Sequence, residues 1–159
     1  MSHGASMYYA FVVLLMLVCP AVWVLCASAS SHHTVAMSIL ILKWFVFWAV
    51  GIRMFAAGVR QVLQPQFTAT QIFGIRSGEP YAIVREVGFG NLAIGTLAIA
   101  SLFRPEWIVP AAVAGGLYYG LAGLAHAFIR GKNAMQETAM ISDAFAFMVL
   151  LIVVTTTLI

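Results

Sequence analysis

The chain has 159 residues, of which 63% are hydrophobic and only 8% are charged, and its mean hydropathy is +1.00. Soluble domains carry about 25% charged residues, so this composition excludes a water-soluble globular domain and predicts that lipid is the solvent for most of the surface. The net charge of +3 comes without a basic run, which argues against nucleic acid as a partner and fits the positive bias of membrane-protein loops.

Five apolar segments have the length of about 20 residues that a transmembrane helix needs. These segments cover 7–29, 37–61, 83–103, 107–129 and 140–159. We therefore predict an all-α fold, an integral membrane bundle of five transmembrane helices that forms a single domain over 1–159. The fourth segment contains a Gly116-x-x-x-Gly120 step, which predicts close packing against a helix of the same protomer or of a dimer partner.

The first segment has a second interpretation as a signal peptide, because Ala27-Ser28-Ala29 fits a cleavage pattern. Two features oppose it: the N-terminal region has no Lys or Arg, and the apolar run is long for a signal peptide. We expect a retained helix; if the segment were removed, the bundle would have four helices.

The stretch 62–82 is the only long predicted loop, and a loop of about 20 residues often holds structure of its own. Within it, "TATQIFGI" predicts a short interfacial helix capped by Thr68 and ending near Gly74. Its lipid-facing side chains are expected to be Ala69, Ile72 and Phe73. The last connection, "RGKNAMQET", is predicted to be a loop.

Basic residues mark the orientation of the bundle. The loop 62–82 with its flanks and the last loop share five of them, namely Arg60, Arg76, Arg85, Arg130 and Lys132. The opposite side has only Arg104 and, within snorkelling distance, Lys43. The positive-inside rule then predicts a multi-pass protein of a bacterial inner membrane, with the N-terminus and the long loop cytoplasmic and the C-terminus external.

Polar residues on four different segments fall at a similar depth on the predicted cytoplasmic side. They are Arg53, Glu86, Asn91, His126 and Asp143. Charged groups within a membrane usually face the bundle interior and pair with one another, so we predict that these five residues line a polar, ligand-binding pocket. We further expect Glu86 to contact a side chain of the second or fourth segment, with Arg53 and His126 as candidates.

Several alternatives stay open for these residues. Glu86 with Arg53 or Arg85 is also explained as a structural ion pair that fixes helix register. Glu86 and Asn91 are five residues apart, about 140° around a helix, so they need not face one pocket. A His with two carboxylates suits zinc, iron or manganese, but no metal motif such as HExxH is present, and we assign no metal site. The basic residues near the helix ends are explained as snorkelling anchors.

The stretches "REVGFGNLAIG", "GGLYYGLAGLAHAF" and "NAMQETAMISDAF" resemble a family of small bacterial polytopic membrane proteins of unknown function. That family repeats an E-V-G-x-x-N-L stretch, a Gly-rich helix ending in His, and a last helix entered through a polar turn. The resemblance covers roughly 50–155. The residues that match its polar pattern are Glu86, Gly88, Asn91, Leu92, His126, Asn133, Glu137 and Asp143. More distantly, size and helix count are similar to those of DoxX-like proteins.

Neither the residues nor the resemblance identifies a catalytic group or a cofactor. Three functions compete. The first is binding or transport of a small ligand, an ion or a proton in the polar pocket. The others are an accessory or assembly subunit of a membrane complex, and a membrane redox or metal-dependent enzyme subunit. The expected partners are the lipid bilayer and either a homo-oligomer or a larger membrane complex.

Overall fold

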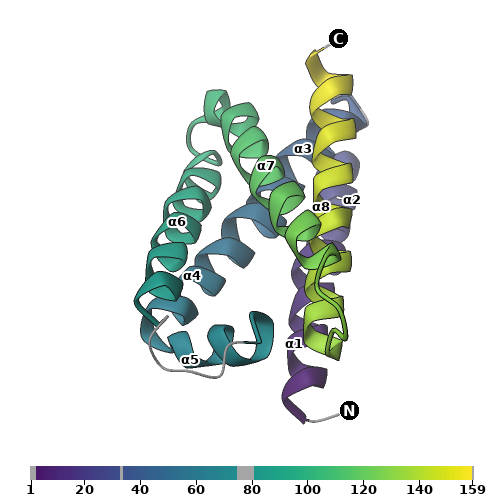
Figure 1. Cartoon of the computed structure of the whole chain (residues 1–159). Coiled ribbons are helices and arrows are strands. Elements are labelled where there is room, and N and C mark those ends of the chain that lie inside the picture. Colours follow the sequence, from purple (N-terminus) through teal and green to yellow (C-terminus); the bar gives the residue numbers. More distant parts are fainter. Residues whose placement is uncertain (1–2, 33, 75–80, 159) are drawn as a thin grey trace.

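The structure is a computed structural model that describes residues 3–32, 34–74 and 81–158, with side chains from residue 6 onward. Within these residues all regular elements are helices, and five helical spans are long and apolar enough to cross a membrane. The spans are Ser6–Ser30, Met37–Leu63, Tyr81–Ala100, Pro105–Ala127 and Ala134–Leu158. The predicted all-α bundle of five transmembrane helices is confirmed (Figure 1).

The first span is a helix with a widened turn near its middle. It consists of α1 (His3–Val13), the π-helical segment η1 (Leu14–Val18) and α2 (Cys19–Ser30). Pro20 lies two residues after the end of the widened turn. Because proline has no N–H for the carbonyl of Met16, and its ring crowds the preceding turn, the regular α-helical pattern cannot continue through this point.

The second span has the same construction without a proline. It runs through α3 (Met37–Phe45), the π-helical segment η2 (Val46–Ile52) and α4 (Arg53–Leu63). Segments of π-helix inside an α-helix occur frequently at functional sites. Here the segment ends at Arg53, one of the five polar residues singled out in the sequence.

Glycines bring α4 against the third span, α6 (Tyr81–Ala100). A Cβ at Gly95 would lie 2.6 Å from the backbone nitrogen of Phe55, and one at Gly58 would lie 2.8 Å from the carbonyl oxygen of Gly88. Contacts this short leave no room for any side chain, so the two backbones touch at these points. This is the small-residue packing typical of membrane helices.

The fourth and fifth spans form a second close pair. The short 3₁₀ turn η4 (Pro105–Trp107) leads into α7 (Ile108–Ala127), which packs along α8 (Ala134–Leu158). At the predicted small-residue step, a Cβ on Gly120 would lie 2.8 Å from the Phe147 ring. The glycine step therefore packs against a helix of the same protomer, which is one of the two predicted arrangements.

The fifth span begins earlier than predicted, since α8 starts at Ala134 and not near 140. Asn133 caps it: its Oδ1 accepts a hydrogen bond from the Gln136 N–H at 2.9 Å, and Gln136 Oε1 accepts one from the Asn133 N–H at 2.9 Å. This reciprocal pair is a capping box. The predicted loop "RGKNAMQET" was wrong in its second half because a polar first turn was taken for a connection.

The prediction for the long loop was right about a helix and wrong about its position. The chain forms α5 (Pro65–Phe67) and the π-helical η3 (Thr68–Ile72), and Gly74 follows with a φ of 70°. Thr68 makes no capping hydrogen bond and is buried, and Ala69 is completely buried instead of facing lipid. This segment packs onto the bundle because its small side chains fit against α8 and α6.

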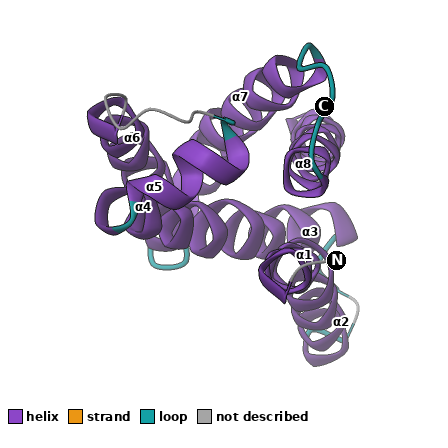
Figure 2. Cartoon of the chain, turned by 60° about the horizontal axis from the view of Figure 1, so that its bottom comes forward, coloured by secondary structure: helices purple, strands orange, loops and turns teal. Residues whose placement is uncertain are grey.

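Two amide side chains fasten that segment to α8. Asn133 Nδ2 donates to the carbonyl of Gln71 at 3.0 Å, and Gln136 Nε2 donates to the carbonyl of Ile72 at 3.1 Å. In Figures 1 and 2 the α5–η3 segment lies across one end of the molecule, between the α4–α6 pair and the helices α1 and α8. The remainder of the predicted loop, 75–80, which includes Arg76, lies outside the described residues.

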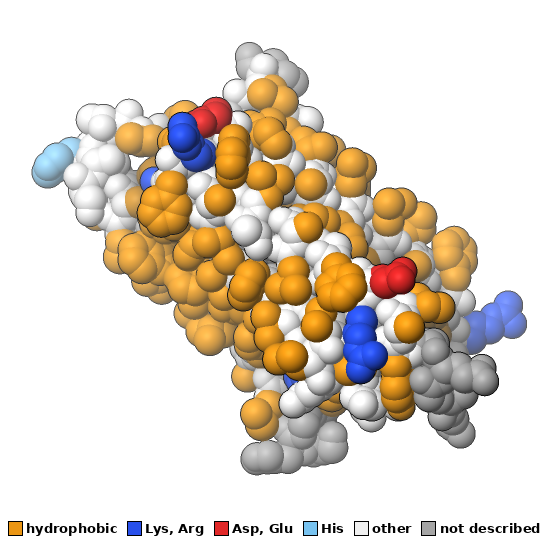
Figure 3. Space-filling view, turned by 90° about the vertical axis from the view of Figure 1, so that its left-hand side faces the viewer, with side chains coloured by type: hydrophobic (Ala, Val, Ile, Leu, Met, Phe, Trp, Pro, Cys, Tyr) orange, Lys and Arg blue, Asp and Glu red, His pale blue; other side chains and the backbone are white. Residues whose placement is uncertain are grey.

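The outer surface suits a bilayer. Figure 3 shows one face on which hydrophobic side chains cover the middle and the few charged side chains gather toward the two ends. Each span has 20 to 27 residues, and about 20 residues at 1.5 Å each cross a hydrocarbon core of about 30 Å. The chain is therefore a multi-pass membrane protein.

Candidate functional site

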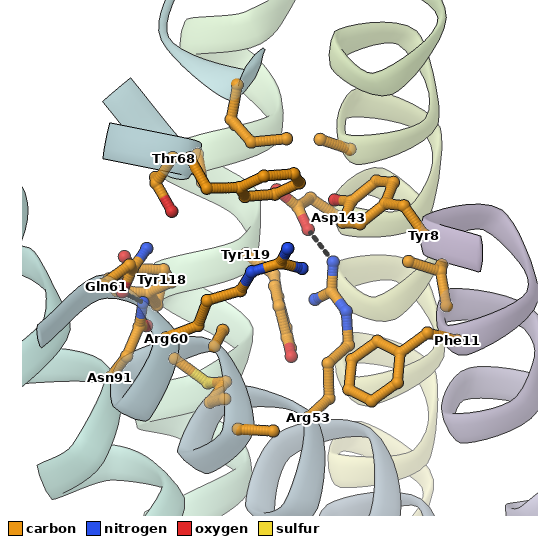
Figure 4. Close-up of a pocket in the computed structure, with 18 of the residues that line it drawn as sticks. Tyr8, Phe11, Arg53, Arg60, Gln61, Thr68, Asn91, Tyr118, Tyr119 and Asp143 are labelled. Carbon is orange, nitrogen blue, oxygen red and sulfur yellow. Dashed lines mark hydrogen bonds and ion pairs between the residues drawn. The ribbon is translucent and has the colours of Figure 1, made fainter. Parts of the chain in front are cut away.

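A cavity of about 340 Å³ lies between the two helix pairs, at the end of the bundle covered by α5 and η3. Five helical spans and the α5–η3 segment contribute to its lining. Its polar lining residues are Tyr8, Arg53, Arg60, Gln61, Thr68, Asn91, Tyr118, Tyr119, His126 and Asp143. The structure thus brings together four of the five residues predicted for a pocket, and Figure 4 shows how several of these side chains face one space.

An ion pair between α4 and α8 crosses the cavity. Arg53 Nη2 lies 3.0 Å from Asp143 Oδ1 and 3.1 Å from Ser142 Oγ (Figure 4). Both charged side chains are nearly buried, with 11% and 9% of their surfaces exposed. Because an unpaired charge is costly inside a membrane, each partner stabilises the charged form of the other. The predicted partner of Arg53 was Glu86, and Asp143 holds that place instead.

Tyr119 fixes Arg53 from a second direction. The Arg53 guanidinium carbon lies 4.9 Å from the centre of the Tyr119 ring, a cation–π contact. The Tyr119 hydroxyl donates a hydrogen bond to the carbonyl of Ala49, in the π-helical segment η2. In a regular α-helix the Arg53 N–H would donate to the Ala49 carbonyl. Here it donates to the carbonyls of Trp48 and Val50 instead. The widened turn therefore frees a backbone acceptor that ties α7 to the residues preceding Arg53.

A second polar group couples α4 to α6 through neutral amides. Asn91 Nδ2 donates to Gln61 Oε1 at 2.7 Å, and Asn91 is buried. Its Oδ1 has no hydrogen-bond partner among the described residues, and neither does the buried Nδ1 of His126 on α7. A buried polar atom without a partner costs about 1–3 kcal/mol. Both residues line the cavity through other atoms, and these two atoms are themselves buried.

Arg60 is the second guanidinium in the lining, and sequence reasoning had made it a snorkelling anchor. Its guanidinium carbon lies 3.5 Å from the centre of the Phe67 ring on α5. Among the described residues no carboxylate lies within ion-pair distance of Arg60. Figure 4 shows its guanidinium directed into the cavity, on the same side as that of Arg53.

Glu86 does not belong to this cavity. Its side chain is exposed and is not part of the lining, and within the described part of the chain it has no hydrogen bond or ion pair to another helix. The expected contact with Arg53 or His126 was wrong. The reason is helical phase: Gly88 and Asn91 are buried on α6, and Glu86 lies about 140° from Asn91.

The described residues contain no group of three His, Cys, Asp or Glu side chains arranged to hold a metal ion. His126 and Asp143 both line the cavity, and Glu86, the third member of the considered ligand set, lies outside it. The arrangement is instead one of charged, amide, aromatic and aliphatic side chains around one volume. Such a site can bind a molecule and orient it.

Some lining residues were missed by sequence reasoning, and their signals differ. Arg60 is seven residues after Arg53 and therefore on the same face of its helix, and as an exposed residue in the last turn of α4 it still fits the predicted snorkelling anchor. Gln61 follows it as an amide inside an apolar span. Tyr8 and Phe11 come from the first span, and Phe67 and Thr68 come from the α5–η3 segment; nothing local in their sequence marks them as lining residues.

Comparison with known proteins gives a family and nothing more specific. A search of the curated proteins and a search of the solved structures each found no match. A likeness to DoxX-like proteins stays an expectation. A family model matches residues 7–159, which is nearly the whole chain. The chain thus belongs to the family of unknown function DUF6790.

Proposed function

We propose that this membrane protein binds a small ligand in the cavity between its helix pairs, as a binding or transport module. The observation that carries the proposal is a volume of about 340 Å³ on which polar side chains from different helices converge, among them Arg53, Asn91 and His126. One water needs about 10–15 Å³, whereas small-molecule sites start near about 300 Å³. The volume therefore suits a small molecule.

The lining has the mixture that ligand sites usually have. Apolar and aromatic side chains make up much of it, and a few polar groups converge from different helices. Arg53 is held by Asp143 and Ser142, and Asn91 is held by Gln61. Groups whose positions are fixed by such contacts lose little freedom when a ligand binds.

Co-purified small molecules test this function. The protein would be purified in a mild detergent, and its bound small molecules would be extracted and identified by mass spectrometry. Ala122→Phe places a ring in the cavity lining, and its neighbour Leu121→Phe, on the exposed face of the same helix, is the matched control. We expect the wild type and Leu121→Phe to retain a molecule that Ala122→Phe loses.

The opposite result is equally clear. If the three proteins carry the same molecules in the same amounts, the cavity does not hold them. If nothing is enriched over an unrelated membrane protein purified in the same way, the cavity has no tightly bound ligand and the proposal fails. Monodisperse elution of Ala122→Phe on size exclusion guards against reading misfolding as lost binding.

A further inference from the structure

The charges that line the cavity do not balance. Arg53 and Asp143 form one ion pair, which leaves the second guanidinium, that of Arg60, without a carboxylate among the described residues. His126 is the remaining lining side chain that can take a positive charge. The cavity therefore has one more positive than negative group.

Arg60 is placed to use this charge on a ligand. Its flat face lies over the Phe67 ring, with the guanidinium carbon 3.5 Å from the ring centre. Stacking occupies the face of a guanidinium and leaves the N–H donors at its edge free, in the fork geometry that matches a carboxylate or a phosphate. Phe67 belongs to α5, so the segment that covers the cavity also positions its unpaired cation.

The positions of the two arginines favour a negatively charged group in the cavity. Figure 4 shows both guanidinium groups directed toward the same cavity, and Arg60 is also exposed to solvent. Asp143 offsets the charge of Arg53 through one oxygen at 3.0 Å. An anion beside Arg60 would balance the remaining positive charge, and the amide and imidazole side chains of Asn91 and His126 belong to the lining of the same cavity.

The rest of the lining is apolar and rich in rings. Six aromatic side chains contribute to it, namely Tyr8, Phe11, Phe67, Phe73, Tyr118 and Tyr119. Aromatic and aliphatic walls gain free energy by covering an apolar body, at about 25 cal/mol per Å². A small hydrated inorganic anion would leave these walls without a partner.

Resting on the proposed binding function, we infer that the ligand is an organic monoanion: one carboxylate or phosphodiester group that binds the edge of Arg60, attached to an apolar body that fills the aromatic part of the cavity. Two sources offer this chemistry, an acidic membrane lipid and a water-soluble aromatic or aliphatic acid. The shared feature is the single negative charge on an apolar body.

A matched charge series tests the inference. The full chain would be placed in nanodiscs of zwitterionic phosphatidylcholine, and its thermal transition measured with 4-phenylbutanoate, 4-phenylbutanamide and 4-phenylbutylamine. These probes share one skeleton and carry a negative, a neutral and a positive head group. We expect the anion to bind at least about tenfold more tightly than the amide and the amine, since charge-assisted hydrogen bonds are about twice as strong as neutral ones.

Arg60→Gln should weaken phenylbutanoate binding about tenfold or more, and Arg85→Gln, an exposed arginine outside the lining, should leave it unchanged. Arg60→Lys keeps the charge but loses the planar fork, and we expect an intermediate affinity. Repeating the titration in nanodiscs with acidic phosphatidylglycerol separates the sources. Competition by that lipid in the wild type, absent in Arg60→Gln, indicates a lipid head group, and no competition indicates a water-soluble acid.

Three results would overturn the inference: equal binding of the three probes, equal behaviour of Arg60→Gln and Arg85→Gln, or no transition shift with phenylbutanoate. Each is distinct from a failure of the proposed function. If Ala122→Phe still removes a co-purified molecule, and that molecule is neutral or cationic, the cavity binds a ligand and only the assignment of its charge is wrong.

Discussion

At the scale of single residues, the Arg53–Asp143 pair is the ion pair that the described residues place inside the bundle. Its two side chains come from α4 and α8, ninety positions apart in sequence, and meet at 3.0 Å. Ser142 and the Tyr119 ring complete the surroundings of the guanidinium. A buried ion pair of this kind adds little over a well-packed apolar pair, but losing one partner leaves an uncompensated charge.

We therefore predict that Asp143→Asn and Arg53→Met each lower the free energy of unfolding by about 3–5 kcal/mol. The double variant Arg53→Met/Asp143→Asn should lose much less than the sum of the two single losses, because no charge is left unpaired. Denaturant unfolding of the four proteins in one detergent gives the coupling energy directly. Strictly additive losses would mean that the two residues contribute independently and that the pair is unimportant to the bundle.

Glu86→Gln is the control for that cycle, since it also removes a carboxylate from a helix of the bundle. Glu86 is exposed and lies outside the cavity lining. Substitutions at such positions usually change stability by no more than about 0.5 kcal/mol, and the co-purified ligand should be retained. A loss of stability comparable to that of Asp143→Asn would contradict the placement of Glu86 outside the site.

At the scale of elements, the bundle is built from two tight helix pairs that diverge around the cavity. Glycine is the means in both pairs: the backbones of α4 and α6 touch at Gly58, Gly88 and Gly95, and Gly120 receives the Phe147 ring between α7 and α8. Small residues allow such approach where lipid supplies no hydrophobic force between helices. Because the helices within each pair pack this closely, the cavity lies between the two pairs and not within either of them.

Substitutions at two glycines of α6 distinguish the effect of helix packing on stability from the effect of helix propensity. Gly95→Ala would set a methyl group 2.6 Å from the backbone nitrogen of Phe55, and at Gly90 a Cβ meets nothing within 4 Å. We predict that Gly95→Ala lowers the free energy of unfolding by about 1–3 kcal/mol. Gly90→Ala should raise it by about 0.4–1 kcal/mol, through reduced freedom of the unfolded chain. Equal thermal transitions of the two variants would contradict backbone contact between α4 and α6.

The same elements show which structure the sequence makes visible. All five spans were predictable, because about twenty apolar residues have few alternatives to a membrane helix. The start of α8 was not predictable, because its first turn is polar. The capping box formed by Asn133 and Gln136 is not followed directly by an apolar run. The burial of Ala69 depends on where the α5–η3 segment docks, which no local pattern encodes.

At the scale of the whole molecule, the sequence predicts how deep each residue lies in the membrane, and the candidate site was predictable only as far as depth determines it. Arg53, Asn91, His126 and Asp143 line one cavity because helices crossing a bilayer place residues at equal depth near one another. Depth says nothing about direction around the helix axis, which is why Glu86 is outside. Tyr8 and Phe67 required the complete arrangement, since they reach the cavity from elements that surround it.

The orientation of the whole bundle decides which compartment meets the cavity. The cavity lies at the end covered by α5 and η3, close to the connections that hold most of the basic residues. By the positive-inside rule we predict that this end is cytoplasmic. A fluorescent reporter that folds only in the cytoplasm should therefore be active when inserted at Ser77 or at Gly131, and inactive when fused after Ile159.

A phosphatase reporter that works only outside the cytoplasm should give the mirror result at the same three positions, which guards against failed expression. The five spans require Ser77 and Ile159 to lie on opposite sides, so equal signals at both would contradict the five-helix topology itself. Opposite signals with the sense reversed would keep the bundle but open the Arg60 end of the cavity to the external side. An acidic ligand would then have to be captured from outside the cell, and Arg60→Gln would impair uptake from that side instead of binding from the cytoplasm.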